Sequence, residues 1–407
     1  MPAEPSPLGG IRVGIALGSL RLGGAERQAL HLARHLRSIG ADARVLGMGE
    51  PGRVTALCDQ AGIPWRSLPG FREAWRQRRR GARGLVDRAR AALGGCENAV
   101  ALLRYARQLR RERCDILVAY TIRANVACAL TWRLAGARAC IWGQRDDGRP
   151  YFASWVERYA LRRASVVVAN ASVGVDWALQ QGMPAQRVQL VHNGVSLDPP
   201  AAFWRQRLGL SPNRLVAGMV ANLHASKDHV TLLRAWQIVC RGMPADAQPP
   251  VLCLAGTYRG TEIGLKALAF DLGLGDTVRF LGPVEDIAGL LSAVDLGILS
   301  SQREGLPNAV LEYMAAGLPV VATDIPGVRE ALGEGAAAYL APPGDADALA
   351  ERVLTLLCSD DLRKAAGAAN RERVAREFAL QRMCVEMAGV IQSLAADARK
   401  GDRVANR

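Results

Sequence analysis

Short apolar runs alternate with amphipathic stretches along most of the chain. The first run, Ile11–Leu17, is almost entirely apolar, as in strands buried on both faces of a sheet. After Gly23-Gly24, residues Ala25 to Ser38 place apolar side chains at helical spacing. Further strand-like runs follow at Ala43–Met48, Asp115–Tyr120, Ala139–Gln144, Ser165–Asn170 and Val188–Val191. This alternation predicts a parallel sheet covered by helices on both faces.

The alternation of strand-like and helix-like stretches stops near Asn193-Gly194. There the segment HNGVSLDPPAAF is rich in glycine and proline and is typical of a linker. The pattern then restarts, and residues 345–396 are expected to be helical throughout. Strand-like runs lie at Arg214–Val220, Val251–Gly256, Thr277–Gly282, Asp295–Ser300 and Pro319–Asp324, with helical stretches at Thr231–Cys240 and Glu262–Leu272. We therefore expect two doubly wound α/β domains, residues 1–195 and 196–376. Two such domains facing each other would form a deep cleft at the carboxyl ends of their strands.

Composition narrows the class of protein. The 407 residues are 50% hydrophobic and 22% charged, which excludes a collagen-like or mostly disordered chain. No run of 18 apolar residues predicts a membrane span, and MPAEPSPLGG lacks the features of a signal peptide, so we expect a cytoplasmic chain. The nine cysteines are scattered and include no CxxC pair, which argues against a disulfide framework or a structural zinc.

The formal net charge of +14 is concentrated in one segment. Residues Phe71–Arg113 hold thirteen arginines against four acids, with Phe71 and Trp75 among them. Such a segment can dock on an anionic membrane surface, and a solvated, salt-bridged helix face is the alternative. No stacking platform or recognition module accompanies it, so we expect no nucleic-acid partner.

The richest motif is SSQREGLPNAVLEYMAAGLPVVATDIPGVREAL, which starts at the end of a predicted strand. Glu304 and Glu312 are separated by seven residues, and Pro307 suits the first turn of a helix. Glu304 would then lie in the loop before that helix and Glu312 in its second turn. Unpaired N–H groups at the helix start attract phosphate, and carboxylates accept hydrogen bonds from sugar hydroxyls. An ordinary capped helix with two solvated glutamates is the alternative.

Other common chemistries lack their motifs. The chain contains no GxxxxGK[ST], GxGxxG or GxSxG, which argues against ATPase, dehydrogenase and hydrolase activities. Asp146-Asp147 is a carboxylate pair without an identifiable third ligand, so we expect no metal site.

The glutamate motif closely resembles the E-x7-E signature of the retaining glycosyltransferases of family 4, which have the GT-B fold. GGAERQALHLARHL, HNGVSLD and VANLHASKDHVTLLRAW also resemble that family, as does the segment from GLGDTVRFLGPV to the signature. The resemblance covers about residues 13–330. It implies two Rossmann-like domains facing across a deep cleft, with the acceptor in the first and the donor in the second, and a C-terminal helix, about 377–407, packing back on the first domain.

The resemblance also implies roles for individual residues. Glu312 would hold the ribose hydroxyls of the donor, Glu304 would contact the transferred sugar, and Lys227 would bind the diphosphate. Val284 would lie beside the nucleotide base, and Gly24 would let the first-domain loop approach the diphosphate. The remaining donor contacts would come from the backbone of Gly305, Leu306, Pro307 and Asn308.

Two positions depart from the family pattern. Asn222 stands five residues before Lys227, where the family has an arginine, so one cation for the leaving diphosphate is missing. His224 and Arg145 are candidates to replace it. Arg145, in GQRDDG, stands where many members carry a histidine near the reacting centre, and a surface arginine paired with a neighbouring aspartate is the alternative.

The resemblance therefore predicts a retaining glycosyltransferase that moves a sugar from a nucleotide-sugar donor to a hydroxyl of a glycan or lipid-linked acceptor, in cell-surface polysaccharide biosynthesis. It requires no cofactor and no metal, because positioning and electrostatics would supply the catalysis. We expect the enzyme in the cytoplasm, peripheral to the inner face of the membrane. A nucleotide-sugar epimerase of the same architecture and a non-catalytic scaffold that binds a membrane or partner remain alternatives.

Overall fold

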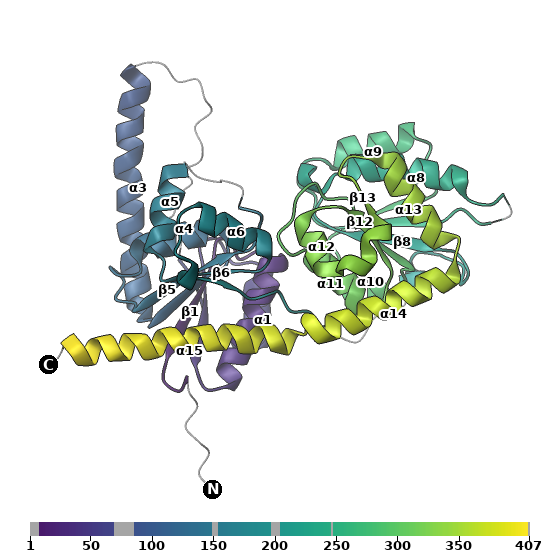
Figure 1. Cartoon of the computed structure of the whole chain (residues 1–407). Coiled ribbons are helices and arrows are strands. Elements are labelled where there is room, and N and C mark those ends of the chain that lie inside the picture. The colour runs from purple at the N-terminus through teal and green to yellow at the C-terminus, as the bar shows by residue number, and fades with distance from the viewer. Residues whose placement is uncertain (1–7, 69–84, 149–153, 197–203, 246, 406–407) are drawn as a thin grey trace, which may run out of the picture. The chain divides into compact units, whose positions relative to one another are not determined.

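The computed structural model describes residues 8–68, 85–148, 154–196, 204–245 and 247–405. The chain forms two compact units (Figure 1). Unit 1 comprises residues 1–192 with 381–407, and unit 2 comprises residues 193–380. The sequence placed the corresponding boundaries at residues 195 and 376.

Unit 1 is built on a seven-stranded sheet in the order β3-β2-β1-β4-β5-β6-β7, in which every neighbouring pair is parallel. Val13 of the central strand pairs with Ala43 on one side and Ile116 on the other. The strands are β1 (Arg12–Leu17), β2 (Asp42–Gly47), β3 (Trp65–Ser67), β4 (Ile116–Ala119), β5 (Ala139–Gln144), β6 (Val166–Ala169) and β7 (Val188–Leu190). All except β3 were predicted. That strand has only three residues, two half-exposed and one exposed, at the sheet edge and therefore carries no apolar signal.

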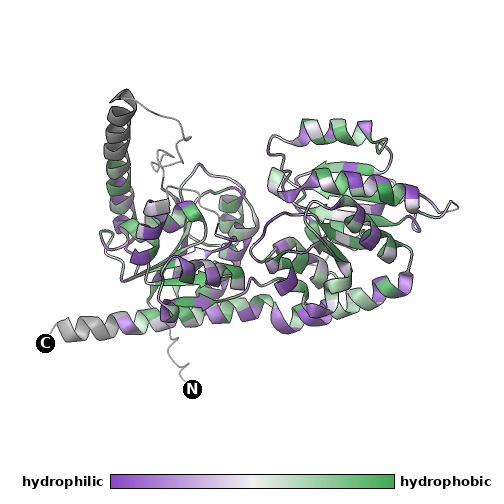
Figure 2. Cartoon of the chain, turned by 45° about the horizontal axis from the view of Figure 1, so that its top comes forward, coloured by the Kyte–Doolittle hydropathy of each residue, from purple (hydrophilic) through white to green (hydrophobic). Residues whose placement is uncertain are grey.

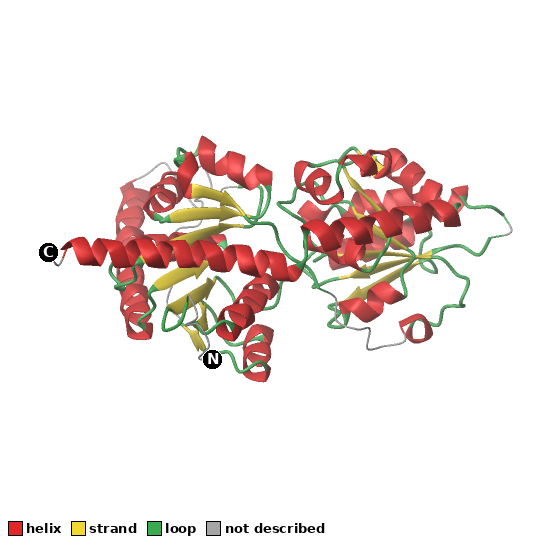
Figure 3. Ribbon diagram, turned by 60° about the horizontal axis from the view of Figure 1, so that its bottom comes forward, coloured by secondary structure: helices red, strands yellow, loops and turns green. Residues whose placement is uncertain are grey.

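Helices cover both faces of this sheet (Figure 1). They are α1 (Gly24–Ser38), α2 (Arg53–Gln60), α3 (Leu85–Glu112), α4 (Ile122–Thr131), α5 (Ser154–Arg163), α6 (Ser172–Gln180) and α15 (Leu380–Ala405). Helices α3 to α6 lie on one face, whereas α1 and α15 lie on the other. Helix α15 lies over the sheet (Figure 3) and buries Cys384, Met387 and Ile391.

Unit 2 repeats the architecture with a six-stranded parallel sheet in the order β10-β9-β8-β11-β12-β13. Its strands are β8 (Val216–Val220), β9 (Val251–Ala255), β10 (Val278–Gly282), β11 (Leu296–Leu299), β12 (Val320–Thr323) and β13 (Leu340–Ala341). Its helices are α7 (Trp204–Arg207), α8 (His229–Gly242), α9 (Glu262–Asp271), α10 (Ile287–Ser292), α11 (Asn308–Ala315), α12 (Pro326–Leu332), α13 (Ala346–Leu357) and α14 (Asp360–Glu377). The hydropathy colouring shows apolar strands and amphipathic helices, which is the pattern from which both units were predicted (Figure 2).

The prediction of one continuous helical stretch over residues 345–396 was wrong. Ser359 ends the first helix and caps α14, because its hydroxyl accepts a hydrogen bond from the Leu362 N–H at 3.3 Å. A second interruption of the helical stretch lies at Ala379, which forms a parallel bridge with Val195. Three helices, α13, α14 and α15, therefore replace one.

Each sheet changes strand order beside its central strand. Strand β1 lies between β2 and β4, and β8 lies between β9 and β11. At such a point the loops after the two adjacent strands turn in opposite directions, leaving space for a ligand at the carboxyl edge. Among the helices in the described ranges, none has the length and apolarity needed to cross a bilayer.

Candidate active site

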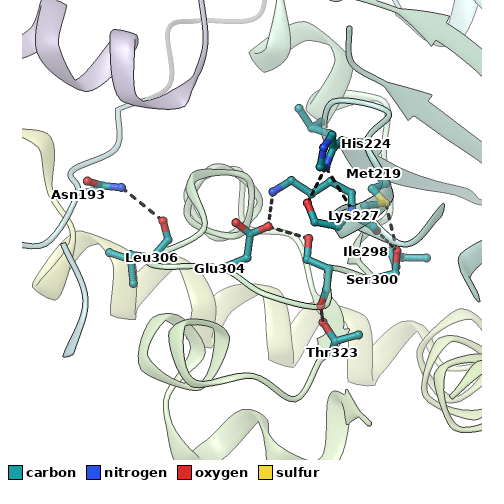
Figure 4. Close-up of polar contacts among 12 residues, drawn as sticks. Asn193, Met219, His224, Lys227, Ile298, Ser300, Glu304, Leu306 and Thr323 are labelled. Carbon is teal, nitrogen blue, oxygen red and sulfur yellow. Dashed lines mark hydrogen bonds and ion pairs between the residues drawn. The ribbon is translucent and has the colours of Figure 1, made fainter. Parts of the chain in front are cut away.

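The candidate site lies at the carboxyl edge of the unit 2 sheet, where the loops after β8 and β11 meet (Figure 4). Hydrogen bonds from Ser300 and Gln302 join these loops. The Gln302 N–H donates to the carbonyl oxygen of Ser226 at 2.9 Å, and the Ser300 hydroxyl donates to the carbonyl oxygen of Lys227 at 2.9 Å. The loops therefore form one platform in which residues 77 positions apart can meet.

Glu304 and Lys227 form an ion pair on this platform. The Ser301 hydroxyl donates to the same carboxylate oxygen, Oε1, at 2.7 Å. The Glu304 side chain is 15% exposed and the Lys227 side chain 25%, so both are held by protein yet reach solvent. The site can therefore offer a ligand a hydrogen-bond acceptor and a cation side by side.

Buried hydroxyl groups support the loop beneath Glu304. The Thr323 hydroxyl, at the end of β12, donates to the Ser301 carbonyl oxygen. Ser300, Ser301 and Thr323 are all buried. These small polar residues satisfy the backbone where β11 ends, which keeps the irregular loop in one conformation.

The helix after Glu304 begins at Asn308, and Pro307 is its N-cap residue instead of lying in its first turn. Asn193 is buried, and its side-chain amide donates to Asn308 Oδ1 at 2.9 Å and to the Leu306 carbonyl oxygen at 3.4 Å. Asn193, in the HNG segment that was interpreted as part of a linker, therefore binds the start of α11 through its side chain. Glu312 is half-buried in the second turn of the helix, as predicted.

Tyr313, next to Glu312, links the helix to the sheet. Its hydroxyl accepts a hydrogen bond from the Val220 N–H at 2.6 Å and donates to the Ile298 carbonyl oxygen at 3.3 Å. It thereby bridges β8 and β11 where their own pairing has ended, since that pairing covers only Leu296 and Gly297. Its role could not be predicted from the sequence, because its apolar neighbours mark Tyr313 only as part of the core.

Asn222, which stands at the position of the missing arginine, and His224, one of its two suggested replacements, both support the loop after β8. His224 Nδ1 accepts a hydrogen bond from the Ser226 N–H at 3.2 Å, which caps the short 3₁₀ turn Ala225–Lys227. Asn222 Oδ1 accepts a hydrogen bond from the Thr257 N–H at 3.2 Å. Both residues are exposed, so the His224 Nε2 and the Asn222 amide nitrogen can still face a ligand.

The turn into α8 fixes the position of Lys227. Asp228 adopts a left-handed conformation with φ of 48° and caps the helix, since its carboxylate accepts from the N–H and hydroxyl of Thr231. His229 follows and is buried, and neither ring nitrogen has a hydrogen-bond partner. Burial, reinforced by the charge of Lys227, lowers the pKa of His229 to about 4.

Val284 follows β10 and is half-buried against an apolar cluster of Trp204, Ala255 and Leu290. It therefore lies at the same edge of the sheet as the loop that holds Lys227, since β10, β9 and β8 are parallel neighbours.

Two of the predicted site residues belong to unit 1. Gly24 is the first residue of α1 and follows the loop after β1. Arg145 follows β5, and its guanidinium carbon lies 4.4 Å from the centre of the Tyr120 ring. Burial lowers the pKa of Arg145, and the aromatic face offsets part of that desolvation. Both positions lie at the carboxyl edge of the unit 1 sheet.

Two further expectations concern metals and the basic segment. Within the described parts of the chain, no three His, Cys, Asp or Glu side chains cluster as a metal site would need. Of the segment Phe71–Arg113, residues 71–84 and the side chains of residues 85–98 lie outside what the structure describes.

Comparison with known families follows the division into units. The family model for the glycosyl transferase 4-like domain matches residues 23–194, and the model for glycosyl transferases group 1 matches residues 201–373. The chain is a family 4 glycosyltransferase. Recognition of the family from the E-x7-E motif and its companions is thereby confirmed.

The curated relatives include N-acetyl-alpha-D-glucosaminyl L-malate synthase of Bacillus anthracis, 24% identical over 72% of this chain and 78% of that protein. Another is 2-deoxystreptamine N-acetyl-D-glucosaminyltransferase of Streptomyces fradiae, 27% identical over 81% of each protein. Among solved structures, Anabaena HepE in complex with UDP and glucose superimposes with a TM-score of 0.77 at 23% identity, covering 94% of this chain and all of that one. Sucrose-phosphate synthase from Thermosynechococcus elongatus has a TM-score of 0.74 at 17% identity, over 95% of this chain and all of the other. These likenesses confirm the GT-B fold.

Proposed function

We propose that this glycosyltransferase moves a sugar from a nucleoside diphosphate donor to a hydroxyl group of a glycan or lipid-linked acceptor, with retention of anomeric configuration, in cell-surface polysaccharide biosynthesis. The observation that carries the proposal is the partly exposed Glu304–Lys227 pair at the carboxyl edge of the unit 2 sheet. A donor has both a polyhydroxylated and an anionic part, which this pair suits.

A uridine diphosphate sugar is the proposed donor class. Two relatives are named as transferring or attaching N-acetylglucosaminyl groups, and the Anabaena protein was solved with UDP and glucose. In this chain, Glu312 would accept hydrogen bonds from the ribose hydroxyls and Lys227 would neutralise the diphosphate. Glu304 would accept hydrogen bonds from the transferred sugar.

The proposed chemistry needs no resident cofactor or metal ion. The glycosidic bond breaks with its electrons passing to the diphosphate oxygen, and the Lys227 ammonium and the N–H groups at the start of α11 would stabilise that negative charge. The departing diphosphate would take the proton of the attacking hydroxyl, so no separate protein base is required. Arg145 of unit 1 is the second cation proposed for this step.

The acceptor and the cellular location belong to the same proposal. A lipid-linked acceptor would bring the enzyme to the inner face of the cell membrane, and the basic segment Phe71–Arg113 would contribute attraction to anionic lipid. The net charge of +14 supports this part of the proposal.

The test combines donor binding with transfer. UDP-sugars should raise the melting temperature of the protein, since a ligand that binds only the folded state stabilises it. Glu304→Gln should abolish transfer and keep the fold, whereas Glu351→Gln, whose side chain is 68% exposed on α13, should match the wild type. Nuclear magnetic resonance of the product would report the anomeric configuration.

Each outcome discriminates between the candidate functions. A sugar that changes configuration with donor alone would indicate an epimerase, and absence of nucleotide binding by calorimetry would indicate a scaffold. Wild-type transfer by Glu304→Gln would overturn the assignment of the site.

A further inference from the structure

Helix α5 of unit 1 exposes two aromatic side chains on one face. Trp155 is 66% exposed and Tyr159 is 55% exposed, although large aromatic side chains of a folded domain are mostly buried. They stand four residues apart and therefore lie on the same side of the helix. The opposite side, with Val156, Ala160 and Leu161, is buried in the core of unit 1.

Arginines fill the rest of that face. Arg158 and Arg162 are exposed and complete the helical spacing with Trp155 and Tyr159. The only acid of α5, Glu157, is buried and so contributes no exposed negative charge. The outer side of α5 is therefore both aromatic and cationic.

The loop after α4 extends this face at the C-terminal end of α5. Trp132 Nε1 donates to the carbonyl oxygen of Arg163 at 3.0 Å, which holds the loop against the helix. Leu134, two residues later, is 59% exposed, and Arg133 beside it is exposed as well. An apolar side chain and another cation thus join the aromatic pair.

Helix α3 lies on the same face of the sheet as α5, with α4 packed against both (Figure 1). Its described C-terminal turns expose Val100 and Leu103, at 46% and 49%, in line with Arg104 and Arg107. The single acid among those turns, Glu112, pairs with Arg44 at 3.2 Å. The described outer sides of α3 and α5 therefore both combine exposed hydrophobic side chains with exposed arginines.

We propose that the outer face of α5, with the adjoining Arg133–Leu134 loop and the exposed turns of α3, is a docking surface for an anionic lipid bilayer; this inference rests on the membrane location in the proposed function and extends it beyond the segment Phe71–Arg113. Trp and Tyr rings prefer the headgroup level of a bilayer, and arginines attract its negative surface. Exposed Val100, Leu103 and Leu134 favour a lipid partner over a nucleic acid, because aliphatic side chains gain from the acyl boundary and offer no stacking surface to bases. This surface is independent of the donor site in unit 2.

The experiment is co-sedimentation of the full chain with phosphatidylcholine vesicles, with and without about one-third phosphatidylglycerol. Arg158→Glu combined with Arg162→Glu, and separately Trp155→Ser, should each weaken binding to the anionic vesicles about tenfold or more. The matched controls are Arg234→Glu with Arg241→Glu on the exposed side of α8, and Phe270→Ser, 81% exposed on α9. Both controls lie in unit 2 and should bind as the wild type does.

Three results would overturn the proposal. The first is unchanged binding by the α5 variants with melting temperatures equal to the wild type. The second is equal binding to vesicles without phosphatidylglycerol, which would remove the role of charge. The third is failure of the wild-type chain to bind either kind of vesicle; oligonucleotide binding that the α5 charge reversal abolishes would then identify a nucleic-acid surface.

Discussion

Gly327, in the first turn of α12, lies directly against the carbonyl oxygen of Gly305. A Cβ at position 327 would stand 1.5 Å from that oxygen and 3.2 Å from the carbonyl oxygen of Glu304. The backbone of α12 and the loop that carries Glu304 therefore touch, and only glycine allows that approach. The position of the Glu304 carboxylate thus depends on a residue beyond the E-x7-E pair itself, which ends at Glu312.

Gly327→Ala should displace the Glu304 loop. Because the obstructing atom is backbone and cannot rotate away, we expect the free energy of unfolding to fall by about 1–3 kcal/mol. Transfer activity should fall further than the loss of folded protein explains. Urea denaturation and initial rates measured on the same preparation would separate the two effects.

The matched control is Gly264→Ala in α9, where an added Cβ meets nothing within 4 Å. This exposed helical position should gain about 0.5–1 kcal/mol from the better helix former, with unchanged activity. A destabilised Gly264→Ala, or a Gly327→Ala as stable as the wild type, would contradict the explanation by close backbone approach.

Tyr313→Phe should loosen the junction of β8 and β11. The substitution keeps the ring but leaves the partly buried Val220 N–H without its partner, which costs about 1–3 kcal/mol of folding free energy. Tyr159→Phe, at an exposed helix position, should change stability by less than about 0.5 kcal/mol. Chemical denaturation of both variants tests this, and equal effects would show that the bridge is unimportant.

Lys227→Ala should reduce donor use far more than stability. The ion pair with Glu304 is partly exposed, so its loss should cost no more than about 1 kcal/mol of folding free energy. Loss of a cation from the diphosphate should lower kcat/KM about a hundredfold, equivalent to a charged hydrogen bond of about 2–3 kcal/mol.

Lys364→Ala serves as the comparison for Lys227. Lys364 pairs with Asp360 on the surface of α14, where the two side chains are 75% and 58% exposed. We expect wild-type kinetics from this variant. Unchanged kcat/KM in Lys227→Ala would remove Lys227 from the donor site.

Stability should depend on pH through His229. Its pKa is lowered to about 4 in the folded protein by burial, below its ordinary value of 6.5. Between about pH 4 and 6.5, His229 therefore binds more protons in the unfolded chain than in the folded protein. The contribution of His229 to the free energy of unfolding is complete above about pH 6.5 and is lost as the pH falls toward 4. Between pH 7.5 and 5 the loss should be on the order of 2 kcal/mol.

The His229 prediction is checked by urea denaturation at several pH values. His229→Phe removes both the titration and the unpartnered ring nitrogens, so the pH dependence of its unfolding free energy should be shallower than that of the wild type. Parallel curves for the two proteins would show that another group is responsible. Staying at or above pH 5 keeps most carboxylates ionised.

Most of the fold could be predicted from local pattern. Strands β5 and β8 were recognised from continuous apolar runs, because a strand buried on both faces has no room for polar side chains. Strands β3 and β13 escaped notice, since they are three and two residues long and owe their pairing to the neighbouring strand. The breaks on either side of α14 depended on a cap and on a bridge to Val195, which hydrophobic periodicity cannot reveal.

The candidate site divides in the same way. Glu304, Lys227 and Glu312 were predicted from the motif and its resemblance, and the structure brings Glu304 and Lys227 into contact across 77 positions of sequence. Ser301 was missed although it stands three residues before Glu304, a spacing at which a hydroxyl can reach the carboxylate within one loop.

The sequence by itself determined the βα alternation, the two repeats of it and the spacing of the two signature glutamates, because these follow from the order of residues along short stretches of chain. Only the tertiary structure decided that Asn193 donates a hydrogen bond to Asn308, 115 positions away, and that the Thr323 hydroxyl donates one to the Ser301 carbonyl oxygen. Those contacts arise from the register of parallel strands and from the way helices pack on them. Sheet register sets which loop ends meet, and no local pattern of hydrophobic and polar residues specifies that.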